Sequence, residues 1–343
     1  MKSKAAILIE QKKDLVIDKI EIPLVEHGKV LVEIKSTRIC GSQLGEIDGV
    51  KGPDHYLPHL IGHEAGGVVR EVGEGVTRVK EGDHVVCHWR PAPGISGKCP
   101  QYEWNCKKVN AGHITTFSEY SILSESRVTP IDKKYSFDVA ALMADTITTG
   151  FGVISNDAKV KIGESVCVIG VGGIGLGVIL GAKLAGANPI IAVDLQDHKL
   201  EKAEQYGATH TINAKDSDIT EALNSITLSG KVDVMIDGTG NPKVIENAFN
   251  LTENTGRCVL FGVIPFNKKV SLNTLPLHFG KVLTGSEGGQ SQPHVDIPRY
   301  LKMMDAGLFN LDGFVSHKYE IEEINEGISK MRNGESIHSI ISF

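Results

Sequence analysis

The stretch Ser165-Val-Cys-Val-Ile-Gly-Val-Gly-Gly-Ile-Gly-Leu-Gly177 decides the fold of the second half of this chain. Its apolar run, Val166–Ile169, has the length and composition of a buried parallel strand, and a Gly-x-Gly-x-x-Gly turn follows it directly, before a helix-like stretch. Gly170 allows the tight turn, Gly172 lets a pyrophosphate approach the backbone, and Gly175 lets the helix pack on the strand. The stretch therefore predicts a dinucleotide-binding turn.

An acidic residue follows at the position that such a turn requires. The next apolar run, Ile190–Asp194, ends in Asp194, nineteen residues after Gly175. A carboxylate there accepts hydrogen bonds from an adenosine ribose and repels a 2′-phosphate. This residue favours NAD over NADP as the cofactor.

Strands and helices alternate beyond the glycine turn, which indicates a doubly wound parallel sheet. We expect strands at residues 209–212, 232–236 and 258–263, and helices at 198–206, 219–226 and 244–251. Two further helices, at 298–308 and 321–331, and a last strand at 339–343 are expected to return to the first domain.

The first half of the chain has the pattern of a β-rich domain, because short β-branched runs are separated by charged or Pro/Gly turns. We expect strands at residues 5–9, 15–20, 30–34, 66–72 and 83–86. Residues 88–111 are rich in Pro, Gly, Lys and aromatics, which predicts a long irregular lobe. A helix at 137–152 would then lead into the nucleotide domain.

Composition narrows the classes of function. The 343 residues, 41% of them hydrophobic, are enough for two cores. A net charge of −6 without a long basic run argues against a nucleic-acid or anionic-membrane partner and favours a small soluble substrate. No signal peptide and no membrane-spanning segment is evident, so we expect a cytoplasmic protein. The six cysteines are too few and too irregular for a disulfide framework.

A possible metal site lies in the first half. Cys40 stands at the end of a β run, and Gly62-His63-Glu64 follows twenty-three residues later within a glycine-bounded turn. A thiolate, an imidazole and a neighbouring carboxylate are donors that a zinc site uses. Each residue alone would more often be a core or a polar structural residue.

Taken together, Cys40-Gly-Ser42, Gly62-His-Glu64, the glycine turn and Asp194 occur in the order that is typical of the zinc-dependent medium-chain alcohol and polyol dehydrogenases, and the chain resembles this family over essentially its whole length. The resemblance implies an α/β protein with a GroES-like β-rich catalytic domain, residues 1–147 and 287–343, and a Rossmann NAD-binding domain with a doubly wound parallel sheet, residues 148–286. It also implies a homodimer or homotetramer.

Carried over from the family, Cys40, His63 and Asp145 would be the ligands of one catalytic zinc, with Glu64 as the adjacent acid. Many members have a cysteine where this chain has Asp145, before the Thr149-Gly pair. The total ligand charge of −2 is unchanged by the exchange, but oxygen donates less electron density than sulfur. The alternative is that Asp145 only caps a helix. Gln43 stands where the family usually has an aspartate that supports the zinc-bound histidine, and this amide would do less to raise the basicity of His63.

Ser42 matches the family hydroxyl that takes the proton of the alcohol. The family relay often ends in a histidine five residues past the first ligand, but this chain has Gly45 there. Substitutes for that histidine remain open, and the candidates are His55, His59 and Glu46.

The resemblance also implies cofactor contacts, with Thr149 and Ile174 near the nicotinamide and Lys199 near the ribose. The expected cofactor-binding residues are Thr149, Gly170, Gly172, Gly173, Ile174, Gly175, Asp194 and Lys199. Gly288-Gly289 resembles a glycine pair near the carboxamide. His338 stands where many members have a pyrophosphate-binding arginine, which would weaken NAD binding or make it depend on pH.

Two further expectations concern the lobe after residue 87. The family's structural zinc needs four closely spaced cysteines, whereas the lobe holds only Cys99 and Cys106, with Cys87 upstream. We therefore expect no structural zinc. Trp89 matches a position that usually lines the substrate pocket, although a core tryptophan is the alternative.

The sequence thus favours an NAD-dependent zinc enzyme that interconverts a secondary alcohol or polyol and its ketone. Arg90 hints at a polar or anionic substrate. The first alternative is a primary-alcohol or formaldehyde-adduct dehydrogenase, because Phe314-Val-Ser-His and Asn333-Gly-Glu-Ser-Ile resemble the C-terminal end of those enzymes. The second is a non-catalytic binding protein that keeps the fold.

Overall fold

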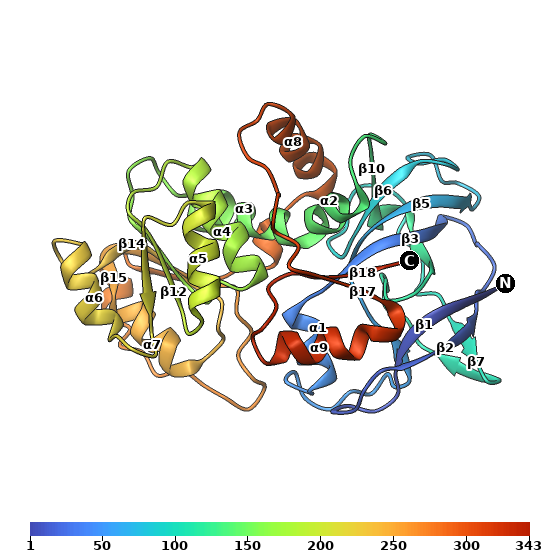
Figure 1. Ribbon diagram of the computed structural model, residues 1–343, viewed down its shortest axis with the longest axis horizontal. Coiled ribbons are helices and arrows are strands. Elements are labelled where there is room, and N and C mark those ends of the chain that lie inside the picture. The colour runs from blue at the N-terminus through green and yellow to red at the C-terminus, as the bar shows by residue number, and fades with distance from the viewer. The chain divides into compact units, whose positions relative to one another are not determined.

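The computed structural model describes all 343 residues of the chain. The chain divides into two compact units: unit 1 holds Met1–Asp145 and Gln292–Phe343, and unit 2 holds Thr146–Ser291. Unit 1 is β-rich, and unit 2 contains a parallel sheet with helices (Figure 1). The predicted fold class is confirmed.

Unit 1 contains two sheets and four α-helices. The first sheet has the order β4-β1-β2-β7-β8, with β4 (His59–Leu60), β1 (Lys2–Leu8), β2 (Val16–Glu21), β7 (Tyr102–Trp104) and β8 (Lys107–Val109). The second follows the order β10-β6-β5-β3-β18-β17, with β9 also paired to β3; its strands are β10 (Val128–Ile131), β6 (His84–His88), β5 (Glu64–Val72), β3 (Lys29–Ile39), β18 (Ser339–Ser342), β17 (His317–Glu320) and β9 (Tyr120–Ser124). The helices are α1 (Gly41–Ile47), α2 (Phe137–Leu142), α8 (Pro293–Asp305) and α9 (Ile324–Arg332).

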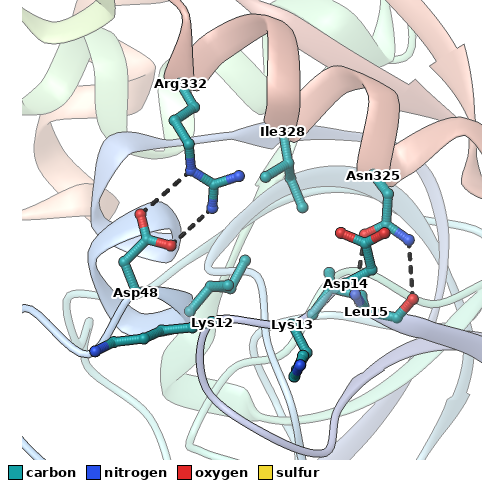
Figure 2. A pocket seen from close by; sticks show the side chains of 9 residues that line it. Lys12, Lys13, Asp14, Leu15, Asp48, Asn325, Ile328 and Arg332 are labelled. Carbon is teal, nitrogen blue, oxygen red and sulfur yellow. Dashed lines mark hydrogen bonds and ion pairs between the residues drawn. The ribbon is translucent and has the colours of Figure 1, made fainter.

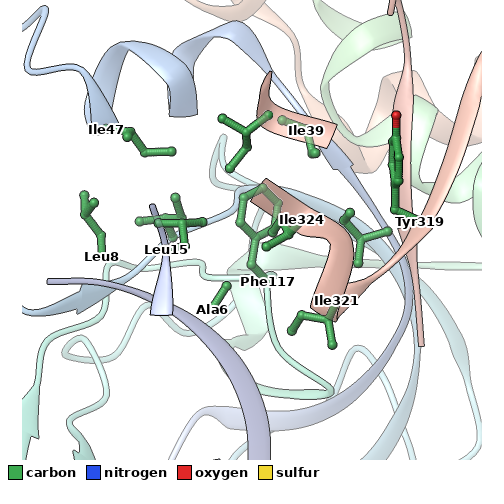
Figure 3. Packing of buried hydrophobic residues seen from close by; sticks show 12 residues of the cluster. Ala6, Leu8, Leu15, Ile39, Ile47, Phe117, Tyr319, Ile321 and Ile324 are labelled. Atoms are coloured by element: carbon green, nitrogen blue, oxygen red, sulfur yellow. The ribbon is translucent and has the colours of Figure 1, made fainter. Parts of the chain in front are cut away.

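The C-terminal segment completes unit 1. Strand β18 pairs antiparallel with β3, with Ile340 opposite Arg38. Ile321 and Ile324, which begin the α9 region, pack in one buried cluster with Leu15 and Ile39 from the other end of the chain (Figure 3). Burial of this apolar surface, at about 25 cal/mol per Å², explains why the last fifty residues are part of this unit.

Unit 2 has a six-stranded parallel sheet in the order β13-β12-β11-β14-β15-β16. Numbered from β11, this is the order 3-2-1-4-5-6 of the doubly wound dinucleotide-binding fold. The elements are β11 (Val166–Ile169), α4 (Gly173–Leu184), β12 (Ile190–Asp194), α5 (Asp197–Tyr206), β13 (His210–Asn213), α6 (Ile219–Ile226), β14 (Val232–Asp237), α7 (Pro242–Asn250), β15 (Thr252–Leu260) and β16 (Val282–Gly285).

A continuous helical segment, residues 137–158, carries the chain from unit 1 into unit 2. It contains α2, a π-helical turn at Met143–Ile147, α3 (Thr148–Gly152) and a second π-helical turn at Val153–Ala158. The segment is long and apolar enough to cross a membrane, but 83% of its most apolar window is buried inside the fold. It is therefore a core helix.

Three local expectations were wrong. Helix α8 begins at Pro293, five residues before the expected start, because Pro293 takes the first helical position and Pro298 lies inside the helix. The lobe at 88–111 is not wholly irregular, since β7 and β8 form a hairpin whose two turn residues, Asn105 and Cys106, have φ of 50° and 59°. Strand β15 begins at Thr252 and ends at Leu260, before the expected end at residue 263.

Candidate functional site

Cys40 is placed where β3 gives way to α1. It is the N-cap residue of α1, with an extended backbone (φ −113°, ψ 154°), and its side chain is buried. Its N–H donates to the side-chain oxygen of Gln43 at 2.6 Å. The side chain of Gln43, in the first turn of α1, thus caps a backbone N–H at the start of this helix.

His63 follows a turn that only glycine can make. Gly62 has φ +99°, and a Cβ there would lie 2.5 Å from the Thr116 hydroxyl and 2.8 Å from the backbone N of Phe117. Strand β5 starts at the next residue, Glu64. The Nδ1 of His63 lies 2.7 Å from Nε2 of the fully buried Gln43, so Gln43 contacts both Cys40 and His63.

Asp145 lies in the π-helical turn Met143–Ile147 and is buried. Its Oδ1 accepts a hydrogen bond from Nε1 of Trp89 at 3.0 Å. Its Oδ2 lies 3.9 Å from Sγ of Cys40 and 3.6 Å from Nε2 of His63. Trp89 is half-buried, and this bond to Asp145 could not be foreseen from the sequence.

The donor atoms of Cys40, His63, Glu64 and Asp145 all lie within 4.8 Å of one another. Nε2 of His63 and Oε2 of Glu64 are buried without a hydrogen-bond partner. Burial lowers the pKa of His63, but the neighbouring Asp145, Cys40 and Glu64 outweigh it and raise that pKa well above its ordinary value. The cluster thus favours positive charge at this point, and its donor set fits Zn²⁺.

Glu64 has a buried ionic partner that sequence reasoning missed. Arg38, on β3 and almost completely buried, places Nε and Nη2 each 3.0 Å from Oε1 of Glu64. Its Nη1 lies 3.3 Å from Nδ1 of His338. The Gly62-His-Glu64 motif does not predict an ion pair between Glu64 and Arg38. This contact depends on the register between β3 and its neighbouring strands.

His338, which stands where many family members have a pyrophosphate-binding arginine, lies in the interior of unit 1. His338 is completely buried between Arg38 and the ring of Phe314, whose centroid is 5.2 Å away. Burial, together with the positive charge of Arg38, lowers the pKa of His338 well below its ordinary value. The side chain therefore stays neutral and supplies no pH-dependent charge.

The glycine turn of unit 2 has the geometry that a dinucleotide needs. Gly170 has φ +89°, and a Cβ on Gly175 would lie 2.2 Å from the carbonyl oxygen of Gly170. Gly172 is the N-cap of α4, has no side-chain cap, and a Cβ there would meet no atom within 4 Å. The first N–H groups of α4, at Gly173 and Ile174, thus begin beside open space, which suits a phosphate.

Asp194 fixes the glycine turn to the end of β12. Its Oδ2 accepts the N–H of Val171 at 3.0 Å, and its Oδ1 accepts those of Leu195 and Gln196 at 2.8 and 3.1 Å. A carboxylate offers about four acceptor sites, so one remains for a ribose hydroxyl. Lys199 lies half-buried in the first turn of α5.

The remaining cofactor candidates lie around α3. Thr149 is buried in that helix. Gly289 has φ +63°, and a Cβ there would lie 2.5 Å from the carbonyl oxygen of Thr149 and 2.7 Å from Cα of Gly152. The glycine pair thus lies directly on α3, within unit 2.

Near the metal cluster, Ser42 Oγ lies 3.5 Å from Nδ1 of His63. Two of the three candidates for the proton relay lie close together: Nε2 of His59 is 3.8 Å from Oε1 of Glu46. The third candidate, His55, is exposed.

In the lobe, Sγ of the exposed Cys99 lies 3.7 Å from Nδ1 of His113, and the exposed Cys106 forms the tip of the β7–β8 turn. Cys87 is buried in β6. None of the three belongs to a group of metal donors.

A surface pocket of about 200 Å³ in unit 1 shares no residue with these sites. Figure 2 shows two contacts among its polar groups: Arg332 with Asp48, and Asn325 with the backbone of Leu15.

Comparison with known proteins identifies the family of the chain. The family models "Alcohol dehydrogenase GroES-like domain" and "Zinc-binding dehydrogenase" match residues 26–133 and 173–306. The S-(hydroxymethyl)glutathione dehydrogenase of Paracoccus denitrificans is 32% identical over the full length of both chains. The benzyl alcohol dehydrogenase of Acinetobacter calcoaceticus has a similar structure, with a TM-score of 0.90 and 27% identity, over 100% of this chain and 99% of that one. The 2R,3R-butanediol dehydrogenase of Bacillus subtilis has a TM-score of 0.80 and 30% identity over 99% of both chains. The chain therefore belongs to the zinc-dependent medium-chain alcohol dehydrogenases, a family of NAD-dependent oxidoreductases.

Proposed function

We propose that this protein transfers hydride between NAD and a secondary alcohol or polyol, or its ketone in the reverse direction, and that it uses one zinc ion. The observation that carries the proposal is the convergence of Cys40, His63 and Asp145 around the unpartnered Nε2 of His63. These residues would hold the metal, which when bound acts as a Lewis acid and lowers the pKa of the substrate hydroxyl.

The neighbouring side chains have separate tasks in this proposal. Ser42 takes the proton of the alcohol on its Oγ. Gln43 lies 2.7 Å from Nδ1 of His63 and orients its ring. Trp89 holds one oxygen of Asp145 and leaves the other facing the cluster.

NAD would bind along the glycine turn of unit 2. The open space at Gly172 and the N–H groups of Gly173 and Ile174 support a pyrophosphate position there. Asp194 would accept a ribose hydroxyl and repel a 2′-phosphate. Thr149, Ile174 and Lys199 remain proposed contacts of the nicotinamide and ribose.

The substrate class is supported by one observation. Similarity to a butanediol dehydrogenase, 30% identical over 99% of both chains, favours a secondary alcohol or diol. The second candidate is a formaldehyde adduct, because curated relatives of 32–34% identity are S-(hydroxymethyl)glutathione dehydrogenase and class-3 alcohol dehydrogenase.

Asp145 provides the direct test of the metal site. In Asp145→Asn, we expect both the zinc content and the rate of NAD reduction to fall by at least about tenfold, because the ligand charge is lost. Asp145→Cys restores a −1 ligand and should retain zinc and turnover. Zinc by elemental analysis and NADH absorbance on the same samples are the two measurements. About one zinc per chain in the wild type, retained in Asp145→Asn together with full activity, would contradict the proposal.

A substrate panel separates the two candidates. Rates with butane-2,3-diol and sorbitol that exceed those with S-(hydroxymethyl)glutathione and benzyl alcohol would support the polyol class. The opposite order would assign the formaldehyde adduct.

We also propose that the chain acts in the cytoplasm as a homodimer or homotetramer. Strand β16 is an unpaired edge of the unit 2 sheet. Large apolar side chains are exposed on this strand and on the segment before it, among them Val263, Phe266, Leu275, Phe279 and Val282. Open edges and apolar patches of this kind are usually covered, and a second copy of β16 could pair with this one.

A further inference from the structure

A second group of metal donors lies in unit 1, apart from the residues discussed as zinc ligands. Glu46 lies on α1, Asp54 precedes β4, and His59 begins β4; one donor atom of each lies within 4.8 Å of the others. We propose that these three residues form a binding site for a divalent transition-metal ion such as Mn²⁺ or Zn²⁺.

Asp54 and His59 are each oriented by a backbone contact. Nδ1 of His59 lies 2.8 Å from the carbonyl oxygen of Leu60 and can only donate to it, so Nε2 is the nitrogen that faces the carboxylates, and a metal would bind there in place of the proton that Nε2 shares with Asp54. Oδ1 of Asp54 accepts the N–H of Tyr56 at 2.8 Å, which leaves Oδ2 facing Nε2 of His59 at 2.7 Å. Histidine ligands of metals commonly have this arrangement, with the far nitrogen bonded to a carbonyl.

The charges of the group are not balanced by the protein alone. Two carboxylates converge on one nitrogen, since Nε2 of His59 is 2.7 Å from Asp54 and 3.8 Å from Glu46. The one N–H at Nε2 of His59 can donate only to Asp54. The carboxylate of Glu46 therefore lies near the carboxylate of Asp54, which has the same charge. Burial raises the pKa of Asp54, but hydrogen bonds from Tyr56 and His59 lower it overall, so the carboxylate is ionised. One imidazole and two carboxylates are a donor set of mixed nitrogen and oxygen that suits these metals.

The spacing of the two carboxylates is fixed by a third segment. Nε2 of Gln11 donates to the carbonyl oxygens of Glu46 and Gly52 at 3.4 and 3.1 Å, and its Oε1 accepts the N–H of Asp54 at 3.3 Å. The end of α1 and the loop to β4 are thus held together before any metal binds. A bound cation would fasten α1, which carries Cys40 at its N-cap and Ser42 in its first turn, to the first sheet.

The test uses Mn²⁺, monitored by electron paramagnetic resonance, on the full chain that already carries one equivalent of Zn²⁺. Because zinc prefers the thiolate of the first site, Mn²⁺ reports the second. We expect about one Mn²⁺ bound per chain, and a dissociation constant at least about tenfold higher in Glu46→Gln. The control is Asp48→Asn, which removes a carboxylate just after α1 but none of the three proposed ligands. It should change the dissociation constant for Mn²⁺ by less than about twofold.

Glu46 is 41% exposed, so its substitution should not unfold the protein, and His59→Gln provides a second variant. The proposal is overturned if no saturable Mn²⁺ binding occurs below about 1 mM, or if Glu46→Gln binds Mn²⁺ as the wild type does. A proton-relay role for Glu46 alone would give the second result, with a changed pH profile of turnover and no change in Mn²⁺ binding.

Discussion

Single side chains outside the proposed ligand set contact the proposed zinc ligands and restrict their orientation. Trp89 donates to one oxygen of Asp145, and Gln43 contacts both Cys40 and His63. Such partners restrict the ligand to one orientation, and their loss typically costs about 10–100-fold in metal affinity.

The first prediction concerns Trp89→Phe. The ring is kept but the N–H is lost, so Asp145 is free to turn, and we expect the zinc dissociation constant to rise by about tenfold. A competition titration against a chromophoric chelator measures it. Trp104→Phe is the matched control, because Nε1 of Trp104 donates to Asp18 at 2.8 Å, outside the cluster. Equal zinc affinity in both variants would show that the bond from Trp89 does not position Asp145.

Arg38 and His338 show how a buried charge is held at the residue scale. Arg38 supplies two nitrogens to one oxygen of Glu64, and His338 stays neutral beside the guanidinium. A second positive charge at His338 would lie in a low-dielectric environment next to Arg38, which explains the direction of its pKa shift.

At the scale of elements, two glycines of the turn have different surroundings. Gly172 faces open space, whereas a Cβ on Gly175 would lie 2.2 Å from the carbonyl oxygen of Gly170. Gly172 has φ −70°, so alanine is tolerated there by the backbone.

The second prediction concerns alanine substitutions at Gly172 and Gly175. Gly172→Ala should keep the thermal midpoint within about 2 °C and weaken NAD binding at least about tenfold, because the methyl group occupies the phosphate position. Gly175→Ala should lower the free energy of unfolding by about 1–3 kcal/mol, because α4 must move away from β11. Calorimetry and NADH fluorescence titration check the two results. A destabilised Gly172→Ala with normal NAD binding would reverse the assigned roles.

Strand β6 ends in a buried histidine that responds to pH. Nδ1 of His88 donates to the carbonyl oxygen of Arg90 at 2.7 Å, and Nε2 accepts from the hydroxyl of Thr129 at 2.9 Å. Burial lowers the pKa of His88 from its ordinary value of 6.5 to about 4. The neutral ring therefore fits the fold, and the protonated ring does not.

The third prediction is a loss of stability in acid that depends on His88. Below pH 6.5 the unfolded chain binds a proton that the folded chain does not bind until about pH 4, so this residue lowers the free energy of unfolding as pH falls, by up to about 3 kcal/mol. Denaturant unfolding at pH 7.5, 6, 5 and 4.5 should show a shallower decline in His88→Gln than in the wild type. Parallel declines would mean that His88 titrates normally in the fold.

At the scale of the whole molecule, the open edge of the unit 2 sheet is the proposed interface between copies of the chain. Phe266 and Phe279 are 77% and 70% exposed in the segment that leads to β16, and Val282 on β16 is also exposed. Their exposure to water is unfavourable unless another surface covers them.

The fourth prediction is that charges at this edge dissociate the assembly. Phe279→Asp combined with Val282→Lys should shift the mass measured by light scattering toward that of one chain, with circular dichroism unchanged. Leu228→Asp is the control, because Leu228 is fully exposed elsewhere in unit 2. A wild type that is already monomeric, or an edge variant that keeps the assembled mass, would contradict the proposed interface.

The sequence by itself determined the alternation of strands and helices in unit 2 and several strands of unit 1. Strand, glycine turn and helix are set by neighbouring residues, so Gly170 and Asp194 could be assigned from local chemistry alone, and the alternating pattern predicted the parallel sheet. Cys40, His63 and Asp145 became candidate ligands through the order of motifs in the chain, and the structure brings their donor atoms together.

Only the tertiary structure decided the partners of these residues. Arg38 meets Glu64 and His338, and Trp89 meets Asp145, because β3 pairs with both β5 and β18 and because a π-helical turn carries Asp145. The group of Glu46, Asp54 and His59 arises in the same way, from a helix, a loop and a strand end that Gln11 joins. Register and packing between distant segments leave no local periodicity, so these contacts could not be read from the sequence.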